Sequence, residues 1–166
     1  MLQQFLAAPR QTGAIAPSSR HLARALADCA FQDDPGVVVE IGAGTGAVTR
    51  ELAARARRHG AHFVAVELEE KMARRVPGGR IVQAHAAWLP VRKADVVVSG
   101  IPFASLRRTE AKAILAEAAR VAPQLVLFQY STRRFDLIGE HFARVRPAAR
   151  VRWNLPPAHV LDARRD

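Results

Sequence analysis

Cysteine and lysine are scarce in this chain of 166 residues. A single cysteine, Cys29, excludes an intrachain disulfide and leaves no thiol cluster for a metal. Cys29 falls on the apolar face of a predicted helix, so we interpret it as buried packing and not as a nucleophile. The only lysines are Lys71, Lys93 and Lys112. Arginine therefore carries most of the positive charge.

Long apolar runs are also absent. No stretch approaches the ~18 residues that a membrane span requires. The N-terminus lacks the basic start and the long apolar core of a secretory signal. No internal repeat and no linker divides the sequence, so we expect one domain over residues 1–166, with an N-terminal helical segment over residues 1–35. These absences predict a cytoplasmic protein.

The net charge of +10, with Lys+Arg 25 against Asp+Glu 15, limits the choice of partners. Such a balance attracts polyanions, which include nucleic acid and anionic lipid surfaces. An arginine-rich composition that serves solubility alone is the other interpretation.

The most informative stretch is an apolar run that leads directly into glycines. The β-branched residues of Val37–Ile41 predict a strand covered on both faces. Gly42-Ala43-Gly44-Thr45-Gly46 follows, and the pattern of Ala47–Arg57 then predicts a helix. Glycines allow a ligand to approach the backbone, and the helix N-terminus offers unpaired N–H groups. A second apolar run ends in Glu67, roughly 20 residues later, where a carboxylate can accept a ribose hydroxyl. The stretch indicates a nucleoside-containing cofactor.

The identity of that cofactor depends on charge. Gly42, Gly44 and Ala47 also satisfy the dinucleotide pattern G-x-G-x-x-A, which would suit a nicotinamide or flavin enzyme. Glu40, just ahead of the first glycine, would repel a pyrophosphate and attract a cofactor with an ammonium and a sulfonium. The E-x-G-x-G-T-G form together with Glu67 resembles the first two motifs of class I S-adenosylmethionine (SAM) methyltransferases. A glycine turn needed only for packing is a third interpretation.

The rest of the chain alternates between strand and helix patterns. Ser18 or Ser19 caps a predicted helix, and a long helix is predicted over Thr109–Val121. Alternation of this kind predicts a mostly parallel sheet with right-handed crossovers, and the last two strands form an antiparallel hairpin. We therefore predict an α/β, Rossmann-like fold with seven strands and N-terminal helices, as in class I methyltransferases. The predicted strands are Val37–Ile41, His62–Glu67, Arg80–Ala84, Ala94–Ser99, Gln124–Tyr130, Ala143–Trp153 and His159–Ala163.

Four further segments resemble a narrower family, the bacterial phospholipid N-methyltransferases. They are Arg10–Arg20, Val97–Phe103 with its S-G-I-P core, Phe128–Ser131, and Asn154–Ala158 with its N-L-P-P turn. Members of this family methylate the amine of phosphatidylethanolamine at a membrane surface, and they are distantly similar to ribosomal RNA adenine dimethylases. The resemblance implies a phospholipid amine as the acceptor.

The segment after the fourth strand favours the lipid over a base. Enzymes that methylate base amines carry an Asn or Asp here, which accepts a hydrogen bond from the target amine. Pro102 and Phe103 match their pattern, but Gly100 occupies the acceptor position. Loss of a polar contact costs discrimination, so an RNA adenine is the less favoured substrate. The residues predicted to orient the acceptor amine are Tyr130, Ser99, Gly100 and Ile101. For Ser99 and Tyr130, strand-end residues satisfied by the backbone are the alternative.

His85 departs from the family, which usually has an Asp after the third strand. A neutral histidine can accept a hydrogen bond from the adenine amino group through one ring nitrogen, whereas imidazolium cannot. An exposed loop histidine is the alternative. Trp88 either covers the adenine or fills the core. The residues predicted to bind the cofactor are Glu40, Gly42, Ala43, Gly44, Thr45, Gly46, Glu67, Leu68, His85, Ala86, Ser99, Pro17, Ser18 and Ser19. No metal site is predicted.

The N-terminus offers a route to the lipid. Leu2, Phe5 and Leu6 form a short apolar stripe near several arginines, which can lie at an anionic membrane surface. We therefore expect a protein peripheral to the inner face of the membrane, although the stripe can equally pack on the domain. An RNA base methyltransferase, an enzyme for another small amine and a non-catalytic SAM-fold module remain as alternatives.

Overall fold

The computed structural model describes residues 18–73, 80–131 and 135–166. The predictions for the Leu2, Phe5 and Leu6 stripe and for Pro17 fall outside the described residues. Within the described part of the chain, no helix is both long enough and apolar enough to cross a bilayer.

A seven-stranded sheet forms the centre of the molecule, in the order β3-β2-β1-β4-β5-β7-β6. The strands are β1 (Val37–Ile41), β2 (His62–Glu67), β3 (Arg80–Gln83), β4 (Val96–Ser99), β5 (Gln124–Gln129), β6 (Arg144–Val151) and β7 (Ala158–Arg164). The first five run parallel, whereas β7 is antiparallel to both β5 and β6. The predicted fold class, including the antiparallel C-terminal hairpin, is confirmed.

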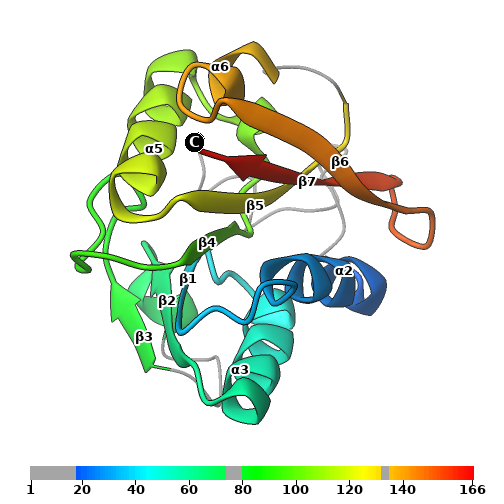
Figure 1. The fold of residues 1–166 in the computed structure, drawn as a ribbon. Coiled ribbons are helices and arrows are strands. Elements are labelled where there is room, and N and C mark those ends of the chain that lie inside the picture. Colours follow the sequence, from blue (N-terminus) through cyan, green and yellow to red (C-terminus); the bar gives the residue numbers. More distant parts are fainter. Residues whose placement is uncertain (1–17, 74–79, 132–134) are drawn as a thin grey trace.

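Helices cover both faces of the sheet (Figure 1). The helices α2 (Arg20–Ala30) and α3 (Ala47–His59) lie on one face, and α5 (Arg108–Val121) and α6 (Phe135–Gly139) lie on the other. A short α4 (Glu70–Ala73) follows β2, and a 3₁₀ turn, η1 (Phe103–Ser105), follows β4. The sequence patterns did not predict α6, because a five-residue helix is too short to show a helical period.

Alternate residues of the central strands pack on opposite faces, as the two-residue period of a strand requires. Val39 and Ile41 of β1 join the cluster under α5 and α6, and Val38 joins the cluster under α2 and α3. Cys29 of α2 is 3% exposed and packs in the second cluster. Burial raises the pKa of its thiol to about 11, so Cys29 is the inert packing residue that the sequence indicated.

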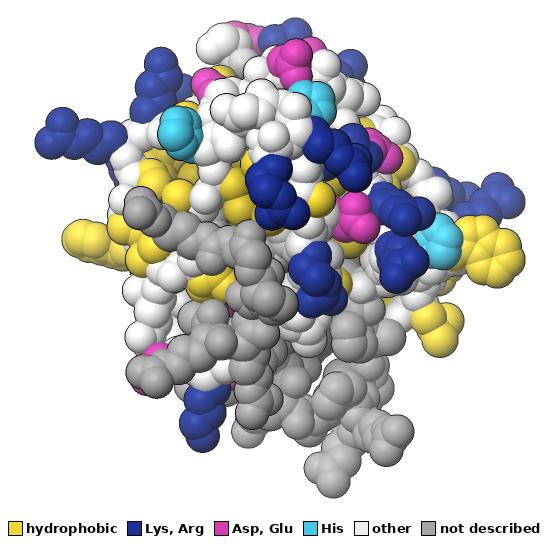
Figure 2. Space-filling view, turned by 90° about the horizontal axis from the view of Figure 1, so that it is seen from below, with side chains coloured by type: hydrophobic (Ala, Val, Ile, Leu, Met, Phe, Trp, Pro, Cys, Tyr) yellow, Lys and Arg dark blue, Asp and Glu magenta, His cyan; other side chains and the backbone are white. Residues whose placement is uncertain are grey.

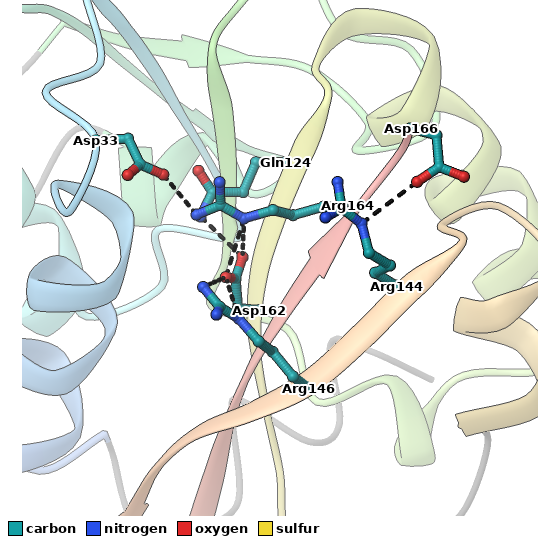
Figure 3. A network of polar contacts seen from close by, with 7 residues as sticks. All are labelled: Asp33, Gln124, Arg144, Arg146, Asp162, Arg164 and Asp166. Atoms are coloured by element: carbon teal, nitrogen blue, oxygen red, sulfur yellow. Dashed lines mark hydrogen bonds and ion pairs between the residues drawn. The ribbon is translucent and has the colours of Figure 1, made fainter.

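A polar network fixes the C-terminal hairpin at the edge of the sheet where β5 begins (Figure 3). The buried Asp162 carboxylate accepts hydrogen bonds from Arg146 Nη2 at 2.8 Å, Gln124 Nε2 at 2.8 Å and Arg164 Nε at 3.0 Å. Arg164 continues the network to Asp33, at 2.6 Å. Together these donors keep the pKa of Asp162 below its usual range, although burial opposes this. The network joins β5, β6 and β7 to the turn that follows α2.

Candidate functional site

The carboxyl edge of the sheet, where the parallel strands end, holds a pocket. Its empty space, including the open mouth, is about 1050 Å³. That size suits a cofactor, since small-molecule sites commonly span about 300–1,000 Å³. The lining residues follow β1, β2, β3 and β4 and include part of α5. Ligands of open α/β sheets bind at this edge, so the pocket is the candidate functional site.

The glycine-rich turn after β1 forms the floor of the pocket. Gly42, Gly44 and Gly46 have positive φ angles of 76°, 52° and 78°, a region that side chains with a Cβ rarely adopt. A Cβ on Gly42 would lie 2.4 Å from the Ile101 side chain. Gly46 caps the N-terminus of α3. This conformation explains why the sequence places glycine at three positions within five residues.

Glu67, at the end of β2, is tied directly to that turn. Its Oε2 accepts a hydrogen bond from the Gly44 N–H at 2.7 Å, and its Oε1 accepts one from the Glu69 N–H at 3.0 Å. Glu67 is 3% exposed and lines the pocket. Each carboxylate oxygen retains a second lone pair, so Glu67 can also accept from a ligand hydroxyl. The structure therefore brings together the glycine turn and the carboxylate that the sequence paired by spacing.

Most of the other predicted residues also line the pocket. Apart from those of the turn and Glu67, they are Ser18, Leu68, His85, Ala86, Gly100, Ile101 and Tyr130, and the turn itself contributes Gly42, Ala43, Gly44 and Thr45. Glu40, Gly46, Ser19 and Ser99 do not line it. Ser19 is the N-cap of α2, where its Oγ accepts a hydrogen bond from the Leu22 N–H at 3.2 Å.

Glu40 lies beneath the turn and not in the pocket. It is 0% exposed, and neither of its carboxyl oxygens has a hydrogen-bond partner among the described residues. Burial raises the pKa of Glu40 to about 8; the nearby Glu67 adds to this rise and Thr49 opposes it. The carboxyl group is therefore mainly protonated at neutral pH. Burial therefore opposes the negative charge that the sequence assigned to Glu40, which weakens the case for attraction between this residue and a cationic cofactor.

Ser99 is engaged in the local turn. Its Oγ accepts from the Ile101 N–H at 3.1 Å and donates to the Ile101 carbonyl at 3.2 Å, and the residue is 0% exposed. The backbone alternative therefore describes Ser99 better than a role as a polar partner of the amine. Gly100 has no room for a side chain, since a Cβ there would lie 2.4 Å from the Gly42 carbonyl oxygen.

His85 lines the pocket, but with the opposite hydrogen-bonding character to that expected. Its Nδ1 accepts a hydrogen bond from the Ala87 N–H at 3.1 Å. The neutral ring therefore carries its hydrogen on Nε2, which can only donate. Trp88, three residues further, is 82% exposed and so does not fill the core.

Glu110 is a pocket residue that no sequence pattern indicated. This residue lies in the first turn of α5 and lines the pocket with Ile114. The same helix contacts the loop after β3, where Glu117 Oε1 accepts from the Leu89 N–H at 2.8 Å. Glu110 and His85 both line the pocket. The available signal was indirect: α5 follows β4, so its N-terminus must begin at the carboxyl edge.

Tyr130, which follows β5, lines the other side of the pocket. Its ring meets that of Phe128 edge to face, with centroids 5.3 Å apart. Burial raises the pKa of Tyr130, while a hydrogen bond with the Asn154 side chain opposes the rise. The hydroxyl is therefore neutral at physiological pH and available to a ligand as a donor or an acceptor.

Comparisons with known proteins agree with this geometry. A family model described as a methyltransferase domain matches residues 38–124, more than half of the chain. No curated protein matches the sequence. Magnesium protoporphyrin IX methyltransferase from Synechocystis PCC 6803, solved with bound SAM, is 20% identical with a TM-score of 0.67, over 89% of this chain and 79% of that one.

Two other solved structures show the same fold. Precorrin-6y C5,15-methyltransferase from Geobacter metallireducens GS-15 is 16% identical with a TM-score of 0.68, over 87% of this chain and 88% of that one. A dimethyladenosine transferase from Plasmodium falciparum is 15% identical with a TM-score of 0.61, over 87% of this chain and 61% of that one. Identities this low support the fold and not the substrate. The chain belongs to the methyltransferase domain family and is an enzyme that uses S-adenosylmethionine as its methyl donor.

Proposed function

We propose that this enzyme transfers methyl groups to the amine of a phospholipid headgroup of the phosphatidylethanolamine type. The observation that carries the proposal is the composition of the pocket beside Gly100 and Tyr130, which offers an amine small hydrogen-bonding groups and offers a base no Asn or Asp acceptor at position 100. The four segments that resemble phospholipid N-methyltransferases support the same substrate.

The residues around the glycine turn fit the donor. Glu67 accepts from the ribose hydroxyls while Gly44 and Glu69 hold its carboxylate in place. His85 Nε2 would supply a hydrogen-bond donor to the adenine, and the Glu110 carboxylate would supply an acceptor for its amino group. When bound, S-adenosylmethionine supplies a methyl group that its sulfonium activates.

The remaining predicted cofactor residues supply shape more than charge. Ala43 and Thr45 line the pocket beside the turn glycines, and Leu68 and Ala86 contribute apolar surface beside Glu67 and His85. Ser18 closes the pocket from the N-terminal side. These contacts align the reacting groups, which is the main contribution a protein makes to a displacement between two bound molecules.

A nucleobase is disfavoured by two neighbouring residues. Position 100 cannot hold an Asn or Asp side chain, because any Cβ there would meet the Gly42 carbonyl oxygen at 2.4 Å. Phe103, whose ring would have to stack on a base, is 1% exposed and packs in the core under α5. Without the acceptor and the ring, a base amine loses its positioning, whereas a flexible primary amine does not depend on them.

Two groups remain to orient such an amine. The Gly100 carbonyl can accept one N–H hydrogen bond, and the Tyr130 hydroxyl, held by Asn154, can accept another. The Ile101 carbonyl already accepts from Ser99 and contributes less. Aligning the nitrogen in this way limits the directions from which it can approach the donor.

The test is an incubation of the full chain with methyl-labelled SAM and three acceptors. These are vesicles that contain phosphatidylethanolamine, free ethanolamine, and structured RNA, which the net charge of +10 keeps as the second candidate. We expect label in the lipid fraction, lowered strongly by Tyr130→Phe with little change in SAM affinity. Label found only in RNA or only in ethanolamine would refute the lipid assignment.

The adenine contacts have a separate test. Glu110→Gln removes the proposed carboxylate acceptor and should weaken binding of S-adenosylhomocysteine (SAH) about tenfold, given about 1.5–3 kcal/mol for a hydrogen bond to a charged group. Glu140→Gln, which changes a carboxylate paired with Lys112 outside the pocket, is the control. Calorimetric titration measures both, and equal affinities would remove Glu110 from the site.

A further inference from the structure

The exposed large hydrophobic side chains of the described residues all lie at the carboxyl edge of the sheet. Leu68 follows β2 and is 38% exposed, and Trp88 follows β3 and is 82% exposed. Trp153 and Leu155, 80% and 79% exposed, lie in the turn between β6 and β7. That turn lies at the same edge, because β7 begins beside the end of β5, with His159 opposite Gln129. Trp153 and Leu155 therefore lie at the edge of the sheet that holds the pocket.

The β6–β7 turn, residues 152–157, is also basic. Residues 144–161 contain four arginines and neither Asp nor Glu. Arg144 and Arg146 pair with acidic residues, whereas the exposed Arg150 and Arg152 have no ion-pair partner within the described ranges. The turn lies at the right of Figure 1, and at the right of Figure 2 hydrophobic side chains project beside Lys, Arg and His side chains.

One buried residue connects the turn to the pocket. Asn154, 4% exposed, lies between the exposed Trp153 and Leu155. Its Oδ1 accepts from the Ser19 N–H at 3.0 Å, its Nδ2 donates to the Pro156 carbonyl at 2.8 Å, and it hydrogen-bonds Tyr130. The turn is thus held against the side of the pocket where Tyr130 lies.

We propose that the β6–β7 turn docks the enzyme on an anionic bilayer, with Trp153 and Leu155 entering the headgroup region and Arg150 and Arg152 contacting lipid phosphates. Tryptophan favours the membrane interface, and basic residues near an anionic surface add attraction. Asn154 then fixes the distance between the bilayer and Tyr130, so the pocket mouth meets headgroup amines. The inference rests on the proposed function for the identity of the surface, and it adds which part of the chain meets that surface.

A bilayer explains the turn better than RNA does. Arginine and tryptophan suit either partner, since both offer phosphates and aromatic rings stack on bases. Leu155, however, is an aliphatic side chain 79% exposed in the turn between β6 and β7, and it gains nothing from a phosphate backbone. Transfer of such a side chain from water to the acyl boundary is favourable.

The two tryptophans of the chain allow a direct test, because Trp88 and Trp153 are the only ones. The full chain with Trp88→Phe reports on Trp153 alone, and the full chain with Trp153→Phe reports on Trp88 alone. Each is mixed with vesicles of phosphatidylcholine and phosphatidylglycerol carrying brominated acyl chains, which quench nearby tryptophans. We expect quenching of Trp153, lost at high salt. Quenching of Trp88 as well would support docking along the whole edge, whereas quenching of Trp88 alone, or of neither, would overturn the proposal.

Charge variants distinguish vesicle binding through the β6–β7 turn from attraction by the overall positive charge of the protein. Arg150→Gln with Arg152→Gln should weaken vesicle binding about 30-fold. Arg57→Gln with Arg58→Gln removes the same charge from exposed positions at the end of α3 and should have a much smaller effect. Equal effects would overturn the proposal. SAH binding, measured on each variant, checks that the pocket remains folded.

The vesicles contain no phosphatidylethanolamine, so docking is measured apart from methylation. Docking without methylation of phosphatidylethanolamine would leave the surface assignment intact and refute the substrate. Methylation of phosphatidylethanolamine vesicles with Trp153 unquenched would refute the docking and leave the substrate. Loss of RNA binding in the Arg150 and Arg152 variant, with vesicle binding unchanged, would assign the turn to nucleic acid and overturn the proposal.

Discussion

The buried Glu40 makes stability depend on pH in an unusual direction. Its carboxyl is fully buried without a hydrogen-bond partner among the described residues, and the pKa rises from 4.5 to about 8. The folded state therefore holds this proton over a range in which the unfolded chain has released it. The contribution to stability is complete below about pH 4.5 and is lost as the pH rises through about 8.

The size of the effect follows from the two pKa values. Between about pH 5 and about pH 8, linkage gives a loss of roughly 3–4 kcal/mol from this one group. The perturbation is Glu40→Gln, which keeps the shape of the protonated side chain and removes the titration. We expect the variant to become increasingly more stable than the wild type as the pH rises across this range.

The assay is denaturant unfolding at several pH values, with the free energy of unfolding compared between the two proteins at each pH. The comparison removes the contributions of every titratable group that the two proteins share. A difference that stays constant between about pH 5 and about pH 8 would refute the assignment of a neutral buried carboxyl. SAH affinity should change little, because Glu40 does not line the pocket.

Three further perturbations test the site and the frame around it. Gly100→Ala should lower the free energy of unfolding by about 1–3 kcal/mol, because its Cβ would meet backbone atoms. Gly139→Ala, with open space around the new Cβ, is the control and should not lower it. Thermal unfolding measures both variants, and similar losses of stability would contradict the close packing at Gly100. Glu67→Gln loses the charge that receives two backbone N–H groups and should weaken SAH binding about tenfold or more by calorimetry; an unchanged affinity would remove Glu67 from the site. Asp162→Asn leaves the Arg146 and Arg164 donors without their carboxylate and should cost about 3 kcal/mol at neutral pH. Because the pKa of Asp162 is lowered in the folded state, the wild type loses this stability as the pH falls below about 4. The difference in free energy of unfolding between the wild type and Asp162→Asn should therefore decrease at low pH. A difference that stays constant would count against the ion pairs.

Local sequence patterns were sufficient to predict the strands of the sheet and, apart from α6, the helices between them. The boundaries of β1 and β2 agree with the prediction residue for residue, since Val37–Ile41 and His62–Glu67 are short apolar runs bounded by turn residues. Other boundaries shifted by one or two residues: α3 continues to His59, and β4 begins at Val96. The turn after β1 was predictable because its three positive φ angles require glycine.

Site chemistry was less predictable, because it depends on partners from distant parts of the chain. The hydrogen on His85 is placed by the Ala87 N–H, and the Ser99 hydroxyl is used by the Ile101 backbone. Glu110 reaches the pocket because α5 packs over the loop after β3. The spacing of residues in a sequence identifies which residue types can meet at a site. The tautomer of a histidine and the lone pairs left free on a hydroxyl depend on contacts that only the folded structure contains.

The amino-acid sequence by itself determined the order of strands and helices, the glycine turn and the carboxylate after β2, since each arises from a local pattern of size, branching and backbone freedom. Only the tertiary structure decided that burial raises the pKa of Glu40, that the neutral His85 ring donates through Nε2, and that exposed Trp153 and Leu155 lie at the same edge as the pocket. Those properties depend on burial and on the antiparallel pairing of β7 with β5. Long-range contacts set both, and no window of sequence contains them.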